Sequence, residues 1–318
     1  MDNAVVQFGL VVLSVGGLWI GARLLVDAVV RLARRCGLSD LTIGLTVVAV
    51  GTSTPELAVS IDAALKGLGD IAVANVLGSN VYNLAFILGI VALVRVIPIS
   101  RSLIHRDGLA LVAGTAIGGG LLLDLRLTRL EGIGLVGLFV LYTVYLLRVE
   151  AAAEPAADVD AITRDLTDRV TFRGRDAVLL VGGVALVLVS GDVLVRAAST
   201  IARNAGISEW VIGGTVVAGG TSTPEFAVSL VAIRRGSLGV SVGNVVGSNL
   251  LNLLGVLGLA ALTHPLTVSG AMLSTLAWLG TITLLIVAAL WTGRELTRVE
   301  GGLFAGSEVV RWVLGLVG

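Results

Sequence analysis

The sequence repeats itself, and the repeated segment places a proline beside a carboxylate within an apolar stretch. Gly-Thr-Ser-Thr-Pro-Glu occurs at 51–56 and again at 220–225, 169 residues later. At the same spacing, fifteen of the nineteen residues in 42–60 and ten of the seventeen in 73–89 are identical. A proline removes a helical hydrogen bond, and a carboxylate in hydrocarbon is energetically costly. A chain that carries both features twice is expected to fold as two related halves that use them together.

The composition places these halves in a membrane. Of 318 residues, 56% are hydrophobic and 14% are charged, whereas soluble domains carry roughly 25% charged residues. About 20 apolar residues span a bilayer as a helix, and long continuous runs favour helices over the alternating strands of a barrel. We therefore predict an all-α polytopic membrane protein with ten transmembrane helices. Their approximate ranges are 4–30, 41–65, 71–97, 107–123, 130–147, 176–202, 210–233, 239–262, 268–291 and 301–317.

The polar segment 148–175 separates the halves and predicts the domain organisation. Residues 1–147 form a first five-helix repeat, 148–175 a linker, and 176–318 a second five-helix repeat. Because five is odd, the second repeat enters the membrane from the opposite side, which predicts inverted-topology repeats. In transporters of this type the substrate site lies near the midplane, where the repeats meet.

The distribution of arginine predicts the orientation. Fourteen arginines lie in loops after odd-numbered helices, including the linker, which predicts that these loops and the linker are cytoplasmic. Both termini are then extracytoplasmic, and we expect an integral protein of a prokaryotic plasma membrane. The first apolar run lacks a preceding basic segment, so it is expected to be a helix rather than a cleaved signal peptide. Loops after even-numbered helices hold only Lys66, Arg126, Arg129 and Arg203.

The duplicated hexapeptide can collect oxygen ligands on one helical turn. Pro55 is expected to free the carbonyl of Gly51, as its counterpart Pro224 does in the second copy. Thr52 and Glu56 are four residues apart, so their side chains share a helix face. Carbonyl, hydroxyl and carboxylate oxygens suit Ca²⁺ or Na⁺ rather than zinc or copper. This motif predicts a cation site inside the membrane.

A second pair of motifs adds neutral oxygens. In Asn75-Val-Leu-Gly-Ser-Asn-Val-Tyr-Asn83 the serine and the last asparagine are four residues apart, and the same spacing recurs at 244–252. We expect these hydroxyl and amide groups to face the hexapeptides. The glycines are expected to allow close helix approach, and the middle asparagines to bond across helices. The expected ligands are Ser79, Asn83, Ser248 and Asn252. The glycines are Gly78 and Gly247, and the middle asparagines are Asn80 and Asn249.

At these motifs the chain resembles the cation/calcium antiporter superfamily, and specifically sodium/calcium exchangers of the prokaryotic type. The resemblance covers both halves and implies a ten-helix inverted-repeat fold in which helices 1 and 6 pack obliquely against an eight-helix core. It implies that Glu56 and Glu225 are central ligands shared by Ca²⁺ and Na⁺. The other implied ligands are Thr52, Ser53, Thr221, Ser222, Ser79, Asn83, Ser248 and Asn252, with the carbonyls of Ala49 and Ala218.

Two departures from relatives refine this expectation. Some members, including the potassium-dependent branch, have an aspartate where this chain has Asn252, which argues against potassium dependence. The linker is also too short for the cytoplasmic calcium-sensing domains of animal exchangers. The glycines of helices 1 and 6 suit helices that slide along a core; they are Gly16, Gly17, Gly21, Gly182, Gly183 and Gly191.

The predicted function is exchange of Ca²⁺ for Na⁺ by alternating access, with competition for shared ligands. The alternative is a proton/calcium antiporter on the same fold, since the two glutamates could carry protons. An intramembrane serine protease is disfavoured because neither histidine lies near Ser53 or Ser222, and a channel would more naturally use oligomeric symmetry. We expect no enzymatic activity, no cofactor, no nucleic-acid partner and no obligate protein partner. The expected partners are Ca²⁺, Na⁺ and the lipid bilayer. The single cysteine, Cys36, excludes an internal disulfide.

Overall fold

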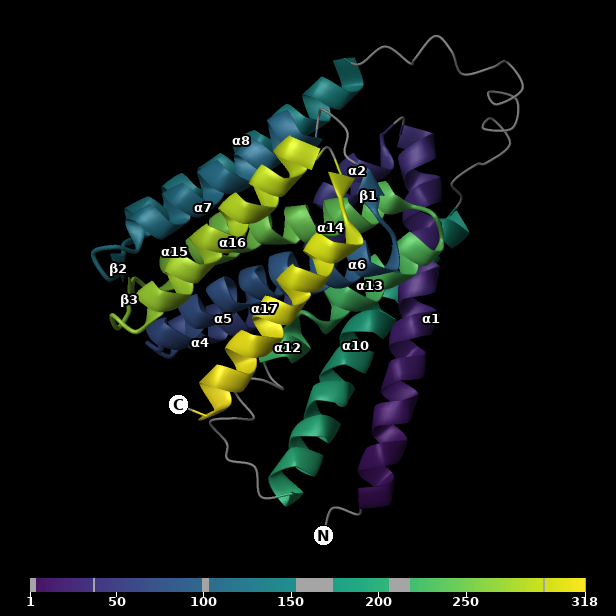
Figure 1. The fold of residues 1–318 in the computed structure, drawn as a ribbon, viewed down its shortest axis with the longest axis horizontal. Helices are drawn as coiled ribbons and strands as arrows, with labels where there is room; N and C mark the ends of the chain where they lie inside the picture. Colours follow the sequence, from purple (N-terminus) through teal and green to yellow (C-terminus); the bar gives the residue numbers. More distant parts are fainter. Residues whose placement is uncertain are drawn as a thin grey trace.

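The structure is a computed structural model that describes residues 4–36, 38–98, 103–152, 174–205, 218–293 and 295–317. Its architecture is helical, with short strands at helix ends (Figure 1). The first half contains α1 (Ala4–Cys36), α2 (Asp40–Ile43), η1 (Gly44–Val48), α3 (Ala49–Thr52), α4 (Thr54–Leu65), α5 (Gly69–Val81), η2 (Tyr82–Ile87), α6 (Leu88–Val94), β1 (Ile97–Pro98), η3 (Leu103–Gly108), α7 (Leu109–Leu121), β2 (Arg126–Leu127) and α8 (Arg129–Ala152). The second half contains α10 (Gly174–Asn204), α12 (Ala218–Thr221), α13 (Thr223–Arg234), α14 (Leu238–Leu250), η5 (Leu251–Val256), α15 (Leu257–Thr263), β3 (Leu266–Thr267), α16 (Met272–Gly293), β4 (Glu295–Leu296) and α17 (Arg298–Val317).

The helices confirm the membrane class but not the number of spans. Within the described residues, six helices are long and apolar enough to cross a bilayer, and a seventh is counted if one bent pair forms a single span. That pair joins Asp40–Thr52 to Thr54–Leu65 at an angle of 49°. Part of the predicted helix 210–233 lies outside the described residues, and α7 is only 13 residues long. Ten spans and their inverted arrangement therefore stay predictions.

The linker is shorter than the sequence predicts. Helix α8 continues to Ala152, and α10 already begins at Gly174, so both ends of the predicted segment 148–175 are helical. Alanines at 151–153 are strong helix formers, which accounts for the extension of α8. The remaining residues, 153–173, lie outside the described part of the chain.

Close backbone contacts join the two halves. Helix α14 runs against α2 and η1, and a Cβ atom added at Gly247 would lie 2.5 Å from the carbonyl oxygen of Leu45. The predicted close approach at Gly247 is thus confirmed. A Cβ at Gly78, the counterpart, meets no atom among the described residues within 4 Å. The residues that repeat the η1 segment, 213–217, lie outside the described part.

Short strands pair across the halves in a reciprocal pattern. β1 pairs antiparallel with β4 through Ile97 and Leu296, and β2 pairs antiparallel with β3 through Leu127 and Leu266. The 169-residue offset that relates the halves converts β1 into β3 and β2 into β4. Each pairing is therefore the repeat counterpart of the other, and the two lie at separate places on the molecule (Figure 1).

Helices α1 and α10 pack against each other beside the rest of the bundle (Figure 1). Gly17 faces Ser190, and a Cβ on Gly183 would meet the Leu25 nitrogen at 2.8 Å. Most of the contacting glycines in these helices therefore allow α1 and α10 to approach each other. Gly191 lies 3.7 Å from the ring of Pro224, and it alone among the six glycines faces the motif helices. The expectation that this glycine set forms a sliding surface along the core is wrong for the remaining five.

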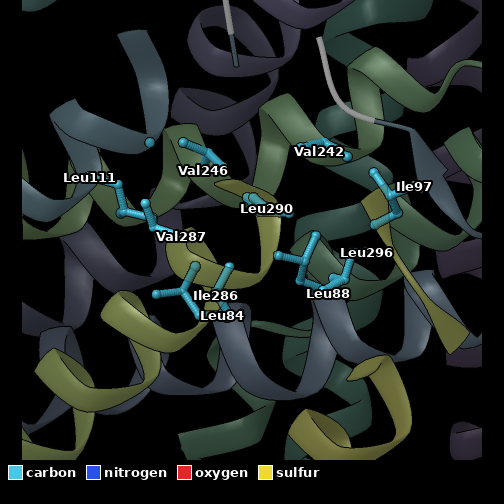
Figure 2. Close-up of a pocket in the computed structure, with 11 residues that line it drawn as sticks. Leu84, Leu88, Ile97, Leu111, Val242, Val246, Ile286, Val287, Leu290 and Leu296 are labelled. Atoms are coloured by element: carbon cyan, nitrogen blue, oxygen red, sulfur yellow. The ribbon is translucent and has the colours of Figure 1, made fainter. Parts of the chain in front are cut away.

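The interior also contains an apolar cavity, lined in part by the apolar residues of the motif helix α14 (Figure 2). It measures about 20 Å³ and is lined by aliphatic side chains such as Leu84, Val246 and Ile286. A buried water needs two to four polar partners, and this lining offers none from its side chains. The cavity is a packing defect of the core and not a binding site.

Candidate functional site

Both copies of the hexapeptide interrupt a helix at their serine. Ser53 separates α3 from α4 with φ −81° and ψ 13°, and Ser222 separates α12 from α13 with φ −88° and ψ 9°. The prolines follow within the first turn of the new helix, where a missing N–H is tolerated. The sequence thus places the two glutamates in the first turns of α4 and α13.

The carbonyl that Pro55 was expected to free has a partner. The hydroxyl of Thr54 donates to the carbonyl of Gly51 at 3.0 Å. In the second copy the Thr223 hydroxyl donates to the carbonyl of Gly219 at 3.2 Å. In both copies the motif's second threonine therefore bonds a carbonyl of the short helix before the break. This bond does not exclude a cation at the Gly51 carbonyl, because a carbonyl oxygen has two lone pairs.

The two glutamates are bonded crosswise between the halves. The Ser53 hydroxyl donates to Oε1 of Glu225 at 2.8 Å, and the Ser222 hydroxyl donates to Oε1 of Glu56 at 2.9 Å. All four residues are fully buried. The sequence copies at 51–56 and 220–225 therefore meet at one centre, as predicted.

Several buried polar groups of the duplicated motifs have no hydrogen-bond partner among the described residues. They include Oε2 of both Glu56 and Glu225, the Ser79 hydroxyl, and the side-chain amide groups of Asn83 and Asn252. No Lys or Arg forms an ion pair with either glutamate in the described part of the chain. Buried carboxylates without counter-charge are strongly disfavoured, so this arrangement requires neutralisation by bound cations or by protons.

The last asparagine of each second motif lies in a π-helical turn. Asn83 is the second residue of η2 and Asn252 the second residue of η5, and both side chains are fully buried. The N–H of Tyr82 is shared between the carbonyls of Gly78 and Ser79 at the first of these junctions. A π-turn inserts an extra residue and is frequent at functional sites. The sequence analysis did not anticipate these π-turns, and the prediction that Asn83 and Asn252 face the hexapeptides stays a prediction.

Three of the remaining predicted residues are placed by their hydrogen bonds, and two by their position in the chain. Thr52 is buried, and its hydroxyl lies 3.2 Å from the Val48 carbonyl and 3.0 Å from the Asn244 amide oxygen. The Ala49 carbonyl accepts the N–H of Ser53 at 3.0 Å. The Ser248 hydroxyl lies 3.4 Å from Oε1 of Glu225. The other two, Thr221 and Ala218, end and begin α12.

Sequence reasoning missed one pair of residues and misjudged another. Asn75 and Asn244 donate to the main-chain carbonyls of Glu56 and Glu225 at 3.1 and 3.2 Å. Both asparagines occupy the same position of the duplicated motif, and this repetition could have indicated their role from sequence. Asn80 does bond across helices, to the carbonyl of Asn249 at 3.2 Å. Asn249 instead donates to the carbonyl of Val245 in its own helix at 2.7 Å, so the cross-helix bond expected from its side chain is not the one formed.

The donor set is hard and oxygen-rich. Among the described residues no group of three or more His, Cys, Asp or Glu side chains could hold a metal ion. Two carboxylates, amide oxygens and hydroxyls together match the oxygen ligands that Ca²⁺ takes and disfavour zinc or copper. The centre is therefore chemically suited to alkali and alkaline-earth cations.

Comparison with known proteins agrees with this chemistry. The model of the family described as "Sodium/calcium exchanger protein" matches residues 6–148 and 176–307. The chain is 38% identical to the putative antiporter CaxA of Alkalimonas amylolytica, over 85% of this chain and 86% of that protein. It is 29% identical to the sodium/calcium exchanger MaX1 of Methanosarcina acetivorans, over 93% and 94% of the two chains.

Solved structures give the same result. The sodium-calcium exchanger NCX_Mj, soaked with Na⁺ and Sr²⁺, superposes with a TM-score of 0.82 at 29% identity and covers 98% of both chains. The family model covers both halves, and the relatives and the structure span nearly the whole sequence. This chain belongs to the sodium/calcium exchanger protein family.

Proposed function

We propose that this cation/calcium antiporter exchanges Ca²⁺ for Na⁺ by alternating access. The observation that carries the proposal is the crosswise pair of buried glutamates, Glu56 and Glu225, each with one carboxylate oxygen left unpartnered. Two ionised carboxylates carry a charge of −2, which one Ca²⁺ or two Na⁺ would neutralise. An empty, doubly charged site is costly in a low-dielectric interior. The protein is then expected to change its access readily only when the site is loaded, which couples the two ion fluxes.

The proposed ligands are those of the duplicated motifs. The carboxylates, the amide oxygens of Asn83 and Asn252 and the nearby hydroxyls can supply the six to eight oxygens that Ca²⁺ prefers. Na⁺ ions would use overlapping subsets of the same oxygens, so the two cations compete. The complete set is Glu56, Glu225, Thr52, Ser53, Thr221, Ser222, Ser79, Asn83, Ser248 and Asn252, with the carbonyls of Ala49 and Ala218.

We further propose ten spans in two inverted five-helix repeats. Reciprocal contacts at the 169-residue offset support it: Ser53 with Glu225 and Ser222 with Glu56, then β1 with β4 and β2 with β3. In the ten-helix arrangement, β1 and β4 follow odd-numbered helices, whereas β2 and β3 follow even-numbered ones. Pairings of this kind fit an inverted repeat, because they join loops on the same side of the membrane.

The α1–α10 pair is the proposed moving element. It packs on the neighbouring helices through a second hydrophobic cluster, which includes residues of α13 as well as of α1 and α10. Helix α10 also passes both motif breaks, with Val184 against Gly51 and Gly191 against Pro224. Rigid-body movement of one bundle against the other around a fixed site is the usual form of alternating access in inverted-repeat transporters.

The contact between this pair and the core is asymmetric. Helix α1 packs on α13, where Asp27 bonds Arg235 at 3.2 Å. In the described residues α10 has no comparable contact with α4, and the repeat counterparts of that ion pair are Arg196 and Lys66, which carry the same sign. The contact of α1 with α13 therefore fits one of the two access states, in which the path to the site is closed on the α13 side.

Sodium is favoured as the counter-ion by the neutral oxygens. Amide and hydroxyl groups coordinate Na⁺ but do not carry protons at physiological pH, and they outnumber the two carboxylates at this centre. The sodium/calcium exchanger names of MaX1 and NCX_Mj add support. A proton antiporter would need only the carboxylates.

The test is Ca²⁺ uptake into proteoliposomes under an imposed gradient. Vesicles loaded with Na⁺ and diluted into Na⁺-free buffer at equal pH should accumulate Ca²⁺, and collapse of the Na⁺ gradient should abolish uptake. Vesicles with an imposed pH gradient and no Na⁺ serve as the matched arm. Uptake in that arm alone would establish the proton alternative and overturn sodium coupling.

A further inference from the structure

Asn244 lies between two proposed ligands that come from opposite halves of the chain. It is fully buried in α14, and its amide nitrogen donates to the main-chain carbonyl of Glu225 at 3.2 Å and to the Ser229 hydroxyl at 3.0 Å. Its amide oxygen accepts from the Thr52 hydroxyl at 3.0 Å. One side chain therefore contacts both Glu225 and Thr52.

The network admits one orientation of the amide. Both N–H groups of Asn244 are used, and its oxygen accepts the Thr52 proton. A flipped amide would set its oxygen against the Glu225 carbonyl, which can only accept. The Ser229 hydroxyl accepts from Asn244 and can pass its own proton to the Ser241 carbonyl at 3.4 Å. Asn244 is consequently fixed with its oxygen toward Thr52.

This orientation matters for a hydroxyl that coordinates a cation. A hydroxyl has one proton and two lone pairs, and the proton must point away from the ion. Asn244 supplies an acceptor for the Thr52 proton at a shorter distance than the Val48 and Ala49 carbonyls, at 3.2 and 3.4 Å. The lone pairs of Thr52 are then available to a cation.

The first half repeats the tether to the glutamate. Asn75 donates to the Glu56 carbonyl at 3.1 Å and to the Ser60 hydroxyl at 2.9 Å. The Ser60 hydroxyl lies 3.2 Å from the Ala72 carbonyl. Each asparagine thus bonds the main chain of a glutamate in the first turn after a helix break.

We propose that Asn75 and Asn244 are positioning residues for cation binding. They hold the glutamate backbones in place, and Asn244 also directs the Thr52 hydroxyl. The inference rests on the proposed function. Ordinary interhelical bonding accounts for the contacts with Ser60 and Ser229. It does not account for the bonds that both asparagines make to glutamate carbonyls, or for the bond between Asn244 and Thr52 of the other half.

The test is Ca²⁺ binding to the purified protein by isothermal titration calorimetry, which does not depend on the counter-ion. Asn244→Ala should weaken Ca²⁺ binding about ten-fold, the size of one buried hydrogen bond. The matched control is Asn249→Ala, because Asn249 is equally buried in α14 but donates only to Val245 of its own helix. Asn249→Ala should bind within about two-fold of the wild type.

A double-mutant cycle separates positioning from general loss of stability. If Asn244 acts partly through Thr52, the effects of Thr52→Val and Asn244→Ala on Ca²⁺ affinity should be clearly less than additive. Equal losses in Asn244→Ala and Asn249→Ala, or full additivity with Thr52→Val, would overturn the Asn244 role. If Asn244→Ala does not fold, Asn75→Ala is measured against the same control, and wild-type affinity there overturns the proposal. Failure of the wild type to bind Ca²⁺ would instead refute the proposed function.

Discussion

Replacing Glu225 with glutamine removes one charge from the centre while leaving its geometry in place. Oε1 of Glu225 accepts from Ser53 at 2.8 Å and lies 3.4 Å from the Ser248 hydroxyl, whereas Oε2 has no partner among the described residues. The glutamine oxygen can keep the first position, and its NH₂ group can occupy the second. We therefore expect Glu225→Gln to fold and to lose cation binding.

The magnitude follows from the missing counter-charge. Removing one member of a buried charge pair costs about 3–5 kcal/mol, which corresponds to roughly 100- to 4,000-fold in Ca²⁺ affinity. The protein without ions behaves differently, because its buried carboxylate has no ion-pair partner in the described residues. Its thermal unfolding midpoint should stay unchanged or rise in the variant.

The assay combines Ca²⁺ calorimetry with thermal unfolding in detergent, and the chain offers a matched control. Glu308 of α17 is also fully buried, but both of its oxygens bond Arg311. Glu308→Gln should lower the unfolding midpoint while Ca²⁺ affinity stays within about three-fold. If Glu225→Gln bound Ca²⁺ as tightly as the wild type, the assignment of this glutamate to the site would be refuted.

Three further predictions test the centre, the interface between the halves and the orientation. Ser53→Ala and Ser222→Ala should each weaken Ca²⁺ binding about ten-fold, since each removes one hydroxyl bonded to a buried carboxylate. Calorimetry that showed an effect for only one of the two variants would contradict the reciprocal arrangement. Gly247→Ala should destabilise the fold by about 1–3 kcal/mol in denaturant titrations, because its Cβ would lie 2.5 Å from a carbonyl oxygen, whereas Gly137→Ala, where nothing lies within 4 Å, should not. Cys36 is exposed at the end of α1, so an impermeant maleimide should label it in inside-out vesicles and not in right-side-out cells; the reverse pattern would place the termini in the cytoplasm.

The sequence predicted the parts of this protein that depend on residue type and spacing. Apolar runs indicated helices, and the 169-residue offset predicted that Glu56 and Glu225 would share one centre. Their crosswise bonds to Ser222 and Ser53 depend on how the two halves dock. Local patterns do not encode docking, so these partners could not be assigned from sequence.

Other features escaped prediction because they depart from regular helix geometry. The π-turns that carry Asn83 and Asn252 leave no clear sequence signal, since their residues are compatible with an α-helix. The Thr54 hydroxyl bonds the carbonyl that Pro55 frees, because a threonine side chain can reach a main-chain carbonyl one turn earlier. From sequence, the glycines of α1 and α10 could face either each other or the core helices. Which of these they face depends on how the helices pack.

The claim that Na⁺ and Ca²⁺ share the two glutamates is tested most directly by competition. Ca²⁺ affinity of the purified wild type is measured by calorimetry at constant pH across increasing Na⁺, with choline replacing Na⁺ to hold ionic strength. The account predicts that apparent Ca²⁺ Kd rises steeply, with more than first-order dependence on Na⁺, and that choline has no such effect. An apparent Kd that is independent of Na⁺ but changes with pH would contradict it.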